Sequence, residues 1–195
     1  MAWMSYNRDN FPDITKTREI AEKLLRLHKD DPEVFDKGFL SYCLKELLES
    51  GSVFISEKAF KKLEDYLKED NANQEKLSKV EKIYSKFSQT SCISDRALIE
   101  RDLDGIRKDV GVVWEHMIPV NILIDILLKT DSDKLQSTLE IIREKAHVAI
   151  ISTDEDKGLN KDGFKQKMPG EDQSIEAIIS APDARYKQKQ IMLKK

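Results

Sequence analysis

The sequence has few of the residues that mark a disulfide-rich, zinc-binding or membrane-spanning protein. Its 195 residues include only two cysteines, Cys43 and Cys92, which form neither a metal-spacing pair nor a disulfide framework. The longest apolar run, residues 117–128, is interrupted by Pro, Asn and Asp, and no apolar signal core precedes Arg8. These absences predict a protein of the reducing cytoplasm with no membrane span.

The sequence also lacks a strong excess of charge of either sign. Its 33 Lys and Arg against 36 Asp and Glu give a net charge of −3, so overall charge provides no argument for nucleic-acid binding. Apolar residues make up 39% of the chain and charged residues 35%, a balance typical of globular proteins. We therefore expect a folded chain with a real core, in one domain or two small ones.

Helical periodicity dominates the first hundred residues. Apolar side chains recur at three- and four-residue spacing, and capping residues or Pro precede several of these segments. The spacing predicts helices over about 14–27, 32–50, 56–67, 74–87 and 94–106. Residues 13–108 should thus be almost wholly helical, and we expect residues 1–108 to form a helical bundle with solvated charged faces.

The pattern changes in the remaining residues. A helix is predicted from Pro119 to Lys129, and another runs from about 131 to 146. His147–Ser152 is β-branched and bounded by turn residues, which predicts a strand packed on the Pro119 helix. Thr153 is the expected cap of the next helix, with Asp156 as its reciprocal partner. Residues 175–179 fit either strand or helix, and a terminal helix starts near Pro182 or Asp183.

These elements predict a fold class that is mainly α with a small α+β part at the C-terminus. The order is an N-terminal helical bundle, then a Glu–His segment at a helix entrance, then one or more short strands. We assign residues 1–108 to the bundle and 109–195 to an α+β catalytic part, with one continuous domain as the alternative.

Glu115 and His116 are the residues with the clearest chemical potential. They stand side by side before Pro119, which favours extended backbone before it and a helix after it. Histidine titrates near neutral pH and is a natural general base, while a neighbouring carboxylate binds divalent cations. However, adjacent residues on a strand point to opposite faces, so the two share one site only if the strand bulges. An ordinary polar pair is the alternative.

The segment Glu115-His116-Met117-Ile118-Pro119 resembles the Asp/Glu-His-x-x-Pro opening of the HNH (ββα-metal) endonucleases. In that family the His is the general base and the neighbouring acid can ligate the catalytic metal. The family pattern continues with an Asn and a His or Asn on the following helix. Here Asn121 comes earlier and His147 later than those positions. The resemblance implies a catalytic His116 and a metal-binding Glu115.

A broader similarity, to a bacterial nuclease or restriction-like group, covers the last eighty residues. It is carried by Trp114-Glu115-His116, Thr153-x-Glu155-Asp156, Met168-Pro169 and Ala184-Arg185-Tyr186 in that order. Glu155 and Asp156 would add oxygen ligands for Mg²⁺ or Mn²⁺, and Arg185 would clamp a phosphate as a bidentate donor. The alternative for the two acids is stabilisation of a helix N-terminus.

Two functions of different classes follow from these observations. The first is a metal-dependent nuclease of a bacterial defence or restriction-type system, with nucleic acid as its substrate. In it His116 activates water, Glu115 with Glu155 or Asp156 holds Mg²⁺ or Mn²⁺, and Arg185 binds phosphate. The second is a non-catalytic helical adaptor whose bundle binds a protein partner. The net charge of −3 favours the adaptor, whereas the Glu–His pair favours the enzyme.

Overall fold

A computed structural model describes residues 23, 25–27, 30, 52–69, 73–170 and 174–194 of the chain. Within the helix predicted over 14–27, Lys23 and residues 25–27 are helical. The helix predicted over 32–50 lies outside the described residues.

The described chain is mainly helical with a small sheet, as the sequence predicted at the level of fold class. Its elements are, in order, β1 (Val53–Ile55), α3 (Glu57–Tyr66), α4 (Gln74–Gln89), β2 (Cys92–Ile93), α5 (Arg96–Leu103), α6 (Arg107–Val110), β3 (Val112–His116), α7 (Val120–Lys129), α8 (Leu135–Lys145), β4 (Val148–Ser152), α9 (Thr153–Lys161), α10 (Ile175–Ser180) and α11 (Ala184–Gln188). The segment 175–179, which fitted strand or helix, is helical.

The four strands form one mixed sheet in the order β2-β1-β4-β3. β1 runs parallel to β4, whereas β2 and β3 are antiparallel to their neighbours. The strand predicted at 147–152 is confirmed as β4. The prediction of almost continuous helix over 13–108 is wrong at β1 and β2, which contribute half of the sheet's strands. Through the β1–β4 pairing, the sheet joins the two predicted parts of the chain.

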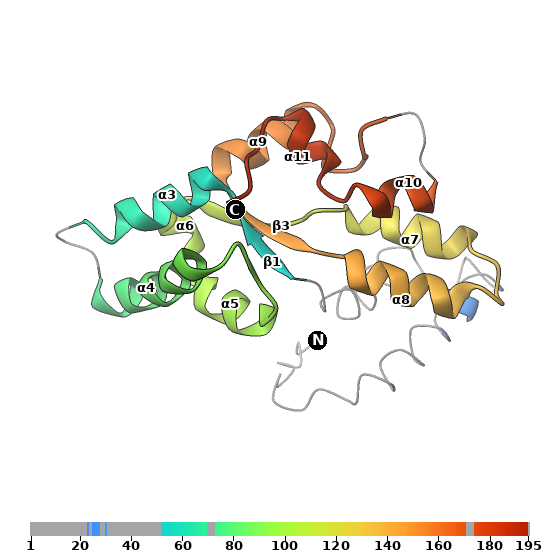
Figure 1. Ribbon diagram of the computed structural model, residues 1–195, viewed down its shortest axis with the longest axis horizontal. Helices are drawn as coiled ribbons and strands as arrows, with labels where there is room; N and C mark the ends of the chain where they lie inside the picture. The colour runs from blue at the N-terminus through green and yellow to red at the C-terminus, as the bar shows by residue number, and fades with distance from the viewer. Residues whose placement is uncertain are drawn as a thin grey trace, which may run out of the picture.

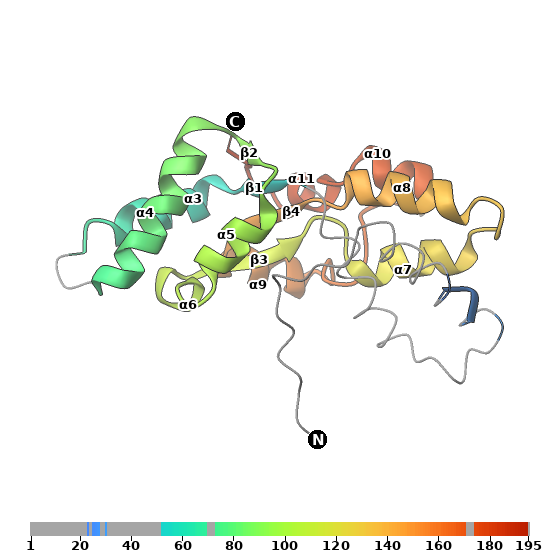
Figure 2. The ribbon, with the colours of Figure 1, turned by 90° about the horizontal axis from the view of Figure 1, so that it is seen from below.

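Helices cover both faces of the sheet. One face of β4, with Val148 and Ile150, packs on α3, α4, α5 and α6, while the other, with Ala149 and Ile151, packs under α9 and α11. Figures 1 and 2 show α3 to α6 at one end of the molecule and α7, α8 and α10 at the other. The latter three helices share a separate apolar cluster. The prediction that the apolar residues of β4 pack on the Pro119 helix, α7, is thus wrong.

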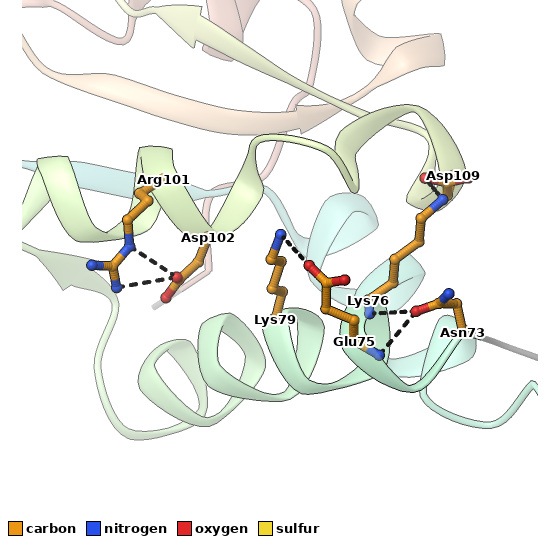
Figure 3. A network of polar contacts seen from close by, with 7 residues as sticks. All are labelled: Asn73, Glu75, Lys76, Lys79, Arg101, Asp102 and Asp109. Atoms are coloured by element: carbon orange, nitrogen blue, oxygen red, sulfur yellow. Dashed lines mark hydrogen bonds and ion pairs between the residues drawn. The ribbon is translucent and has the colours of Figure 1, made fainter. Parts of the chain in front are cut away.

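The charged faces of α4 to α6 form internal ion pairs at the surface. Lys76 lies 3.0 Å from Asp109, and Lys79 lies 3.2 Å from Glu75 one turn earlier, as Figure 3 shows. Asn73 caps α4 by accepting from two backbone N–H groups of the first turn. Such exposed pairs contribute little to stability, so this network is a solvated face, as the sequence indicated.

Candidate functional site

The register of β3 places the side chains of Glu115 and His116 on opposite faces of the sheet. Glu115 pairs with Ala149 and His116 with Val148 in an unbroken antiparallel ladder. Paired residues of such a ladder project to the same side. Since Ala149 packs under α9 and α11 and Val148 packs on α3 to α6, Glu115 and His116 face different layers. The predicted single Glu–His site is therefore not formed, because β3 has no bulge.

Glu115 is instead joined to Arg185, which follows it by 70 residues. The Arg185 side chain is fully buried, whereas 20% of the Glu115 side chain is exposed, and Nη2 lies 2.5 Å from Glu115 Oε1. Arg185 Nε donates to the carbonyl of Met117 at 2.9 Å, and Nη1 donates to that of Phe164 at 2.6 Å. Nη2 also contacts the carbonyl of His116. One guanidinium thus fastens α11 to the end of β3 and to the loop after α9.

These contacts change the role predicted for Arg185. A phosphate clamp needs an open guanidinium edge, but all three nitrogens of Arg185 donate to protein acceptors in a buried setting. The structure therefore does not support a phosphate clamp at Arg185. It supports a positioning role, in which Arg185 fixes the Oε1 side of Glu115 and leaves Oε2 for another partner. The ring of Tyr186 adds to this setting, 5.4 Å from the guanidinium carbon.

The Glu115 carboxyl is electrostatically unusual. Burial raises its pKa above the usual value, the Arg185 guanidinium acts in the opposite direction, and the nearby charges of Asp156 and Lys165 add a smaller rise and fall. Burial also raises the pKa of the Tyr186 phenol, which keeps that hydroxyl protonated. Perturbed carboxyl groups of this kind are frequent in functional sites, although ion pairs of purely structural importance also produce them.

Glu155 has a structural role that differs from the predicted metal ligation. Its side chain is buried, and Oε2 accepts from the Ser56 hydroxyl at 2.6 Å and from the Ser152 N–H at 2.8 Å. Ser152 in turn caps the N–H of Glu155, so the capping box is Ser152–Glu155 and the one predicted at Thr153–Asp156 is wrong by one residue. Glu155 therefore links the ends of the parallel strands β1 and β4, with little capacity left for a metal ion.

Asp156 is the second predicted ligand that stays available. It lies on the first turn of α9, is partly exposed, and accepts at Oδ2 from the side chain of Asn160 at 3.0 Å. Its charge raises the pKa of Glu115. Among the residues that the structure describes, no three His, Cys, Asp or Glu side chains are grouped to hold a metal. Of the predicted ligands, Glu115 and Asp156 keep carboxylates that are partly exposed.

Sequence reasoning did not identify Lys165 and Tyr186 as members of this site. Lys165 is exposed on the loop after α9, and its charge lowers the pKa of Glu115. Tyr186 was noted only as part of an ordered motif, and its position beside Arg185 follows from the short helix α11. No local pattern connects residues 115, 165 and 186. These residues are far apart in the sequence, and the packing of α9 and α11 on β3 brings them to the same side of the sheet.

The remaining histidine that the structure describes, His147, has a structural contact. Its Nδ1 accepts from the Ser52 N–H at 3.2 Å, and its ring packs edge-on against Phe54 at 5.3 Å. Burial lowers the pKa of this imidazole. His147 therefore helps to hold β1 beside β4.

Comparisons of the chain with protein-family models, with curated proteins and with solved structures found no match. In the part of the chain that the structure describes, none of the helices has the length and apolar character needed to cross a membrane.

Proposed function

We propose that this protein is a metal-dependent hydrolase of phosphodiester bonds in nucleic acid, with its site on the α9 and α11 side of the sheet. The observation that carries the proposal is the arrangement of Glu115. Its carboxylate is fixed by a fully buried arginine, is still 20% exposed, and lies in the field of a second carboxylate, Asp156. A charged side chain that is fixed in one orientation and only partly exposed is a recurrent feature of metal and catalytic sites.

The residues present fit Mg²⁺ or Mn²⁺ better than zinc. Arg185 bonds Glu115 at Oε1 and Asn160 bonds Asp156 at Oδ2, so within the described part of the chain Oε2 and Oδ1 would be the carboxylate oxygens open to an ion. Mg²⁺ is commonly held by one or two carboxylates and keeps several waters, whereas a structural zinc site needs four protein ligands. When bound, such an ion activates water and offsets phosphate charge. Arg185 would hold the Glu115 ligand in place, and Lys165 would bring a positive charge to the phosphate.

This proposal differs from the mechanism that the sequence suggested in the roles of His116, Glu155 and Arg185. His116 faces the α3 to α6 layer, so we assign it no role in proton transfer at Glu115. The nuclease chemistry then depends on the two carboxylates and on Lys165. We further propose that the protein acts in the cytoplasm, the compartment that its two cysteines suggested, in a bacterial defence or restriction-type system.

A non-catalytic helical adaptor is the second candidate function. It is favoured by the internal use of Arg185 and Glu155, and by the absence of a three-ligand metal group among the described residues. In that case the Glu115–Arg185 pair is only a structural junction, and a helical layer binds a protein partner.

Cleavage assays with matched variants separate the two functions. Plasmid, single-stranded DNA and structured RNA are incubated with and without Mg²⁺ or Mn²⁺, using the wild type, Glu115→Gln and Asp156→Asn. Asp154→Asn is the control, since Asp154 lies on the same helical turn but its side chain is 73% exposed, beside Lys157. We expect metal-dependent cleavage that the first two changes remove and the control preserves. No cleavage of any substrate, together with equal Mn²⁺ binding by the wild type and a variant that carries both Glu115→Gln and Asp156→Asn, would favour the adaptor.

A further inference from the structure

The loop after α9 has a backbone that is fixed at several points. Gly163 adopts φ +75°, which ends α9, and Phe164 N–H donates to the Leu159 carbonyl at 2.9 Å. The carbonyl of Phe164 accepts from Arg185, and that of Gln166 accepts from Asn121 on α7. The side chains of Phe164 and, four residues later, the Met that precedes Pro169 are buried. These anchors hold the loop in one conformation before any partner binds.

Three lysines in or next to this fixed segment are exposed. Lys161 is the last residue of α9, Lys165 and Lys167 follow in the loop, and none of them makes an ion pair with any acid that the structure describes. The Lys167 ammonium lies over the Phe164 ring, 5.6 Å from its centroid. We call Lys161, Lys165 and Lys167 the basic loop face. Residues 157–170 hold four lysines and one acid, Asp162, which pairs with Lys189 at 2.5 Å, whereas the chain as a whole carries −3.

Several lysines elsewhere on the molecule differ from the basic loop face. Lys61 on α3, Lys68 just after it, and Lys76 and Lys79 on α4 lie within 3.2 Å of acidic side chains. Figure 3 shows two of these pairs. Helix-surface lysines of that kind are neutralised by the protein itself. The lysines after α9 are available for an external anion.

We propose that the basic loop face binds the phosphate backbone of a nucleic acid and directs it to Glu115. The proposal rests on the proposed function, because it takes the same nucleic acid as its ligand. Its geometric basis is the Arg185 guanidinium, which donates both to the carbonyl of Phe164, the residue before Lys165, and to the Glu115 carboxylate. Lysines presented by a preset backbone lose little loop entropy on binding.

The surroundings favour a nucleic acid over an anionic membrane surface. Membrane-surface binding combines basic residues with an apolar face that enters the lipid. The exposed large apolar side chains that the structure describes are Leu27, Ile141 and Met192, and none lies in residues 157–170. A basic surface without apolar residues fits a sequence-independent contact with phosphates.

The test measures binding without cleavage. Fluorescence anisotropy follows a labelled single strand and a duplex in excess chelator at 50, 100 and 200 mM NaCl. The test variant replaces Lys161, Lys165 and Lys167 by Gln. The control variant replaces three exposed lysines of α3, α4 and α6 by Gln, namely Lys58, Lys82 and Lys108. Vesicles containing phosphatidylserine provide the membrane arm.

The expected result is a change in salt dependence that only the test variant shows. Three phosphate contacts make log affinity fall with log salt by a slope of about 2–3. The factor by which affinity falls between 50 and 200 mM NaCl should therefore be about 20 to 40 times smaller for the test variant than for the wild type. The control variant should match the wild type. Loss of binding by the test variant without cleavage by the wild type in any metal would support this surface and refute the proposed hydrolysis. Equal slopes for both triple variants, or binding to vesicles in place of oligonucleotides, would overturn the proposal.

Discussion

Replacing Arg185 by methionine removes the guanidinium while keeping most of the side-chain volume, and we predict a large loss of stability. The change leaves the Glu115 carboxylate without its charged partner and removes donors from the carbonyls of Met117 and Phe164. Breaking a buried ion pair from one side costs about 3–5 kcal/mol. Because 20% of the Glu115 side chain is exposed and water can reach it, we expect the lower end of that range.

The expected loss is readily measured by thermal unfolding. A change of about 3 kcal/mol corresponds to a melting temperature lower by about 6–12 °C in a protein of this size. The melting temperature of Arg185→Lys should lie between those of the wild type and Arg185→Met, because an ammonium group keeps the charge but cannot reproduce the planar guanidinium. Lys187→Met is the control on the same helix, since its side chain is 71% exposed and its pair with Asp183 is a surface contact. If Arg185→Met melted as close to the wild type as this control does, the positioning role would be refuted.

Two further predictions concern the contacts that hold the strands. Glu155→Ala should lower the free energy of unfolding by about 2–4 kcal/mol, because the buried Ser56 hydroxyl and Ser152 N–H lose their acceptor. Glu155→Gln should lower it less. Denaturant titrations should give the same loss with and without Mn²⁺. A stability loss seen only with Mn²⁺ would restore Glu155 as a ligand. Burial lowers the pKa of His147 in the folded state, so the unfolded chain binds a proton first and stability falls as pH drops below about 6.5. The melting temperature should therefore decrease more from pH 7.5 to 5.5 in the wild type than in His147→Gln, because glutamine does not take up a proton where His147 accepts from the Ser52 N–H. Equal decreases in the two proteins would exclude this contribution.

The helices were largely predictable because their signal is local. The spacing of apolar residues predicted a helix over 74–87, and α4 spans Gln74–Gln89 with Asn73 as its cap. The strands β1 and β2 were not predictable in the same way. Val53–Ile55 is three apolar residues, too few to distinguish a strand from the edge of a helix. Its parallel pairing with β4, some 95 residues later, is a property of tertiary packing alone.

The site was predictable in part. The alternation rule already indicated that Glu115 and His116 would separate on a regular strand, and the unbroken register of β3 realises that separation. Sequence identified Arg185 as important but assigned it to a phosphate, because its real acceptors lie 21 to 70 residues away. The capping box was placed one residue late, although Ser152 with Glu155 has the commoner partner for a serine cap.

The proposed reaction uses the Glu115 carboxylate and does not use the His116 imidazole. The most direct measurement is the rate of Mn²⁺-dependent cleavage by Glu115→Gln and His116→Ala on one nucleic-acid substrate, with melting temperatures taken alongside. We expect a loss of about a hundredfold or more for Glu115→Gln, from removal of a charged ligand, and a rate within about threefold of the wild type for His116→Ala. A loss of about 10²–10⁴-fold in His116→Ala with unchanged stability, and near-normal cleavage by Glu115→Gln, would contradict it.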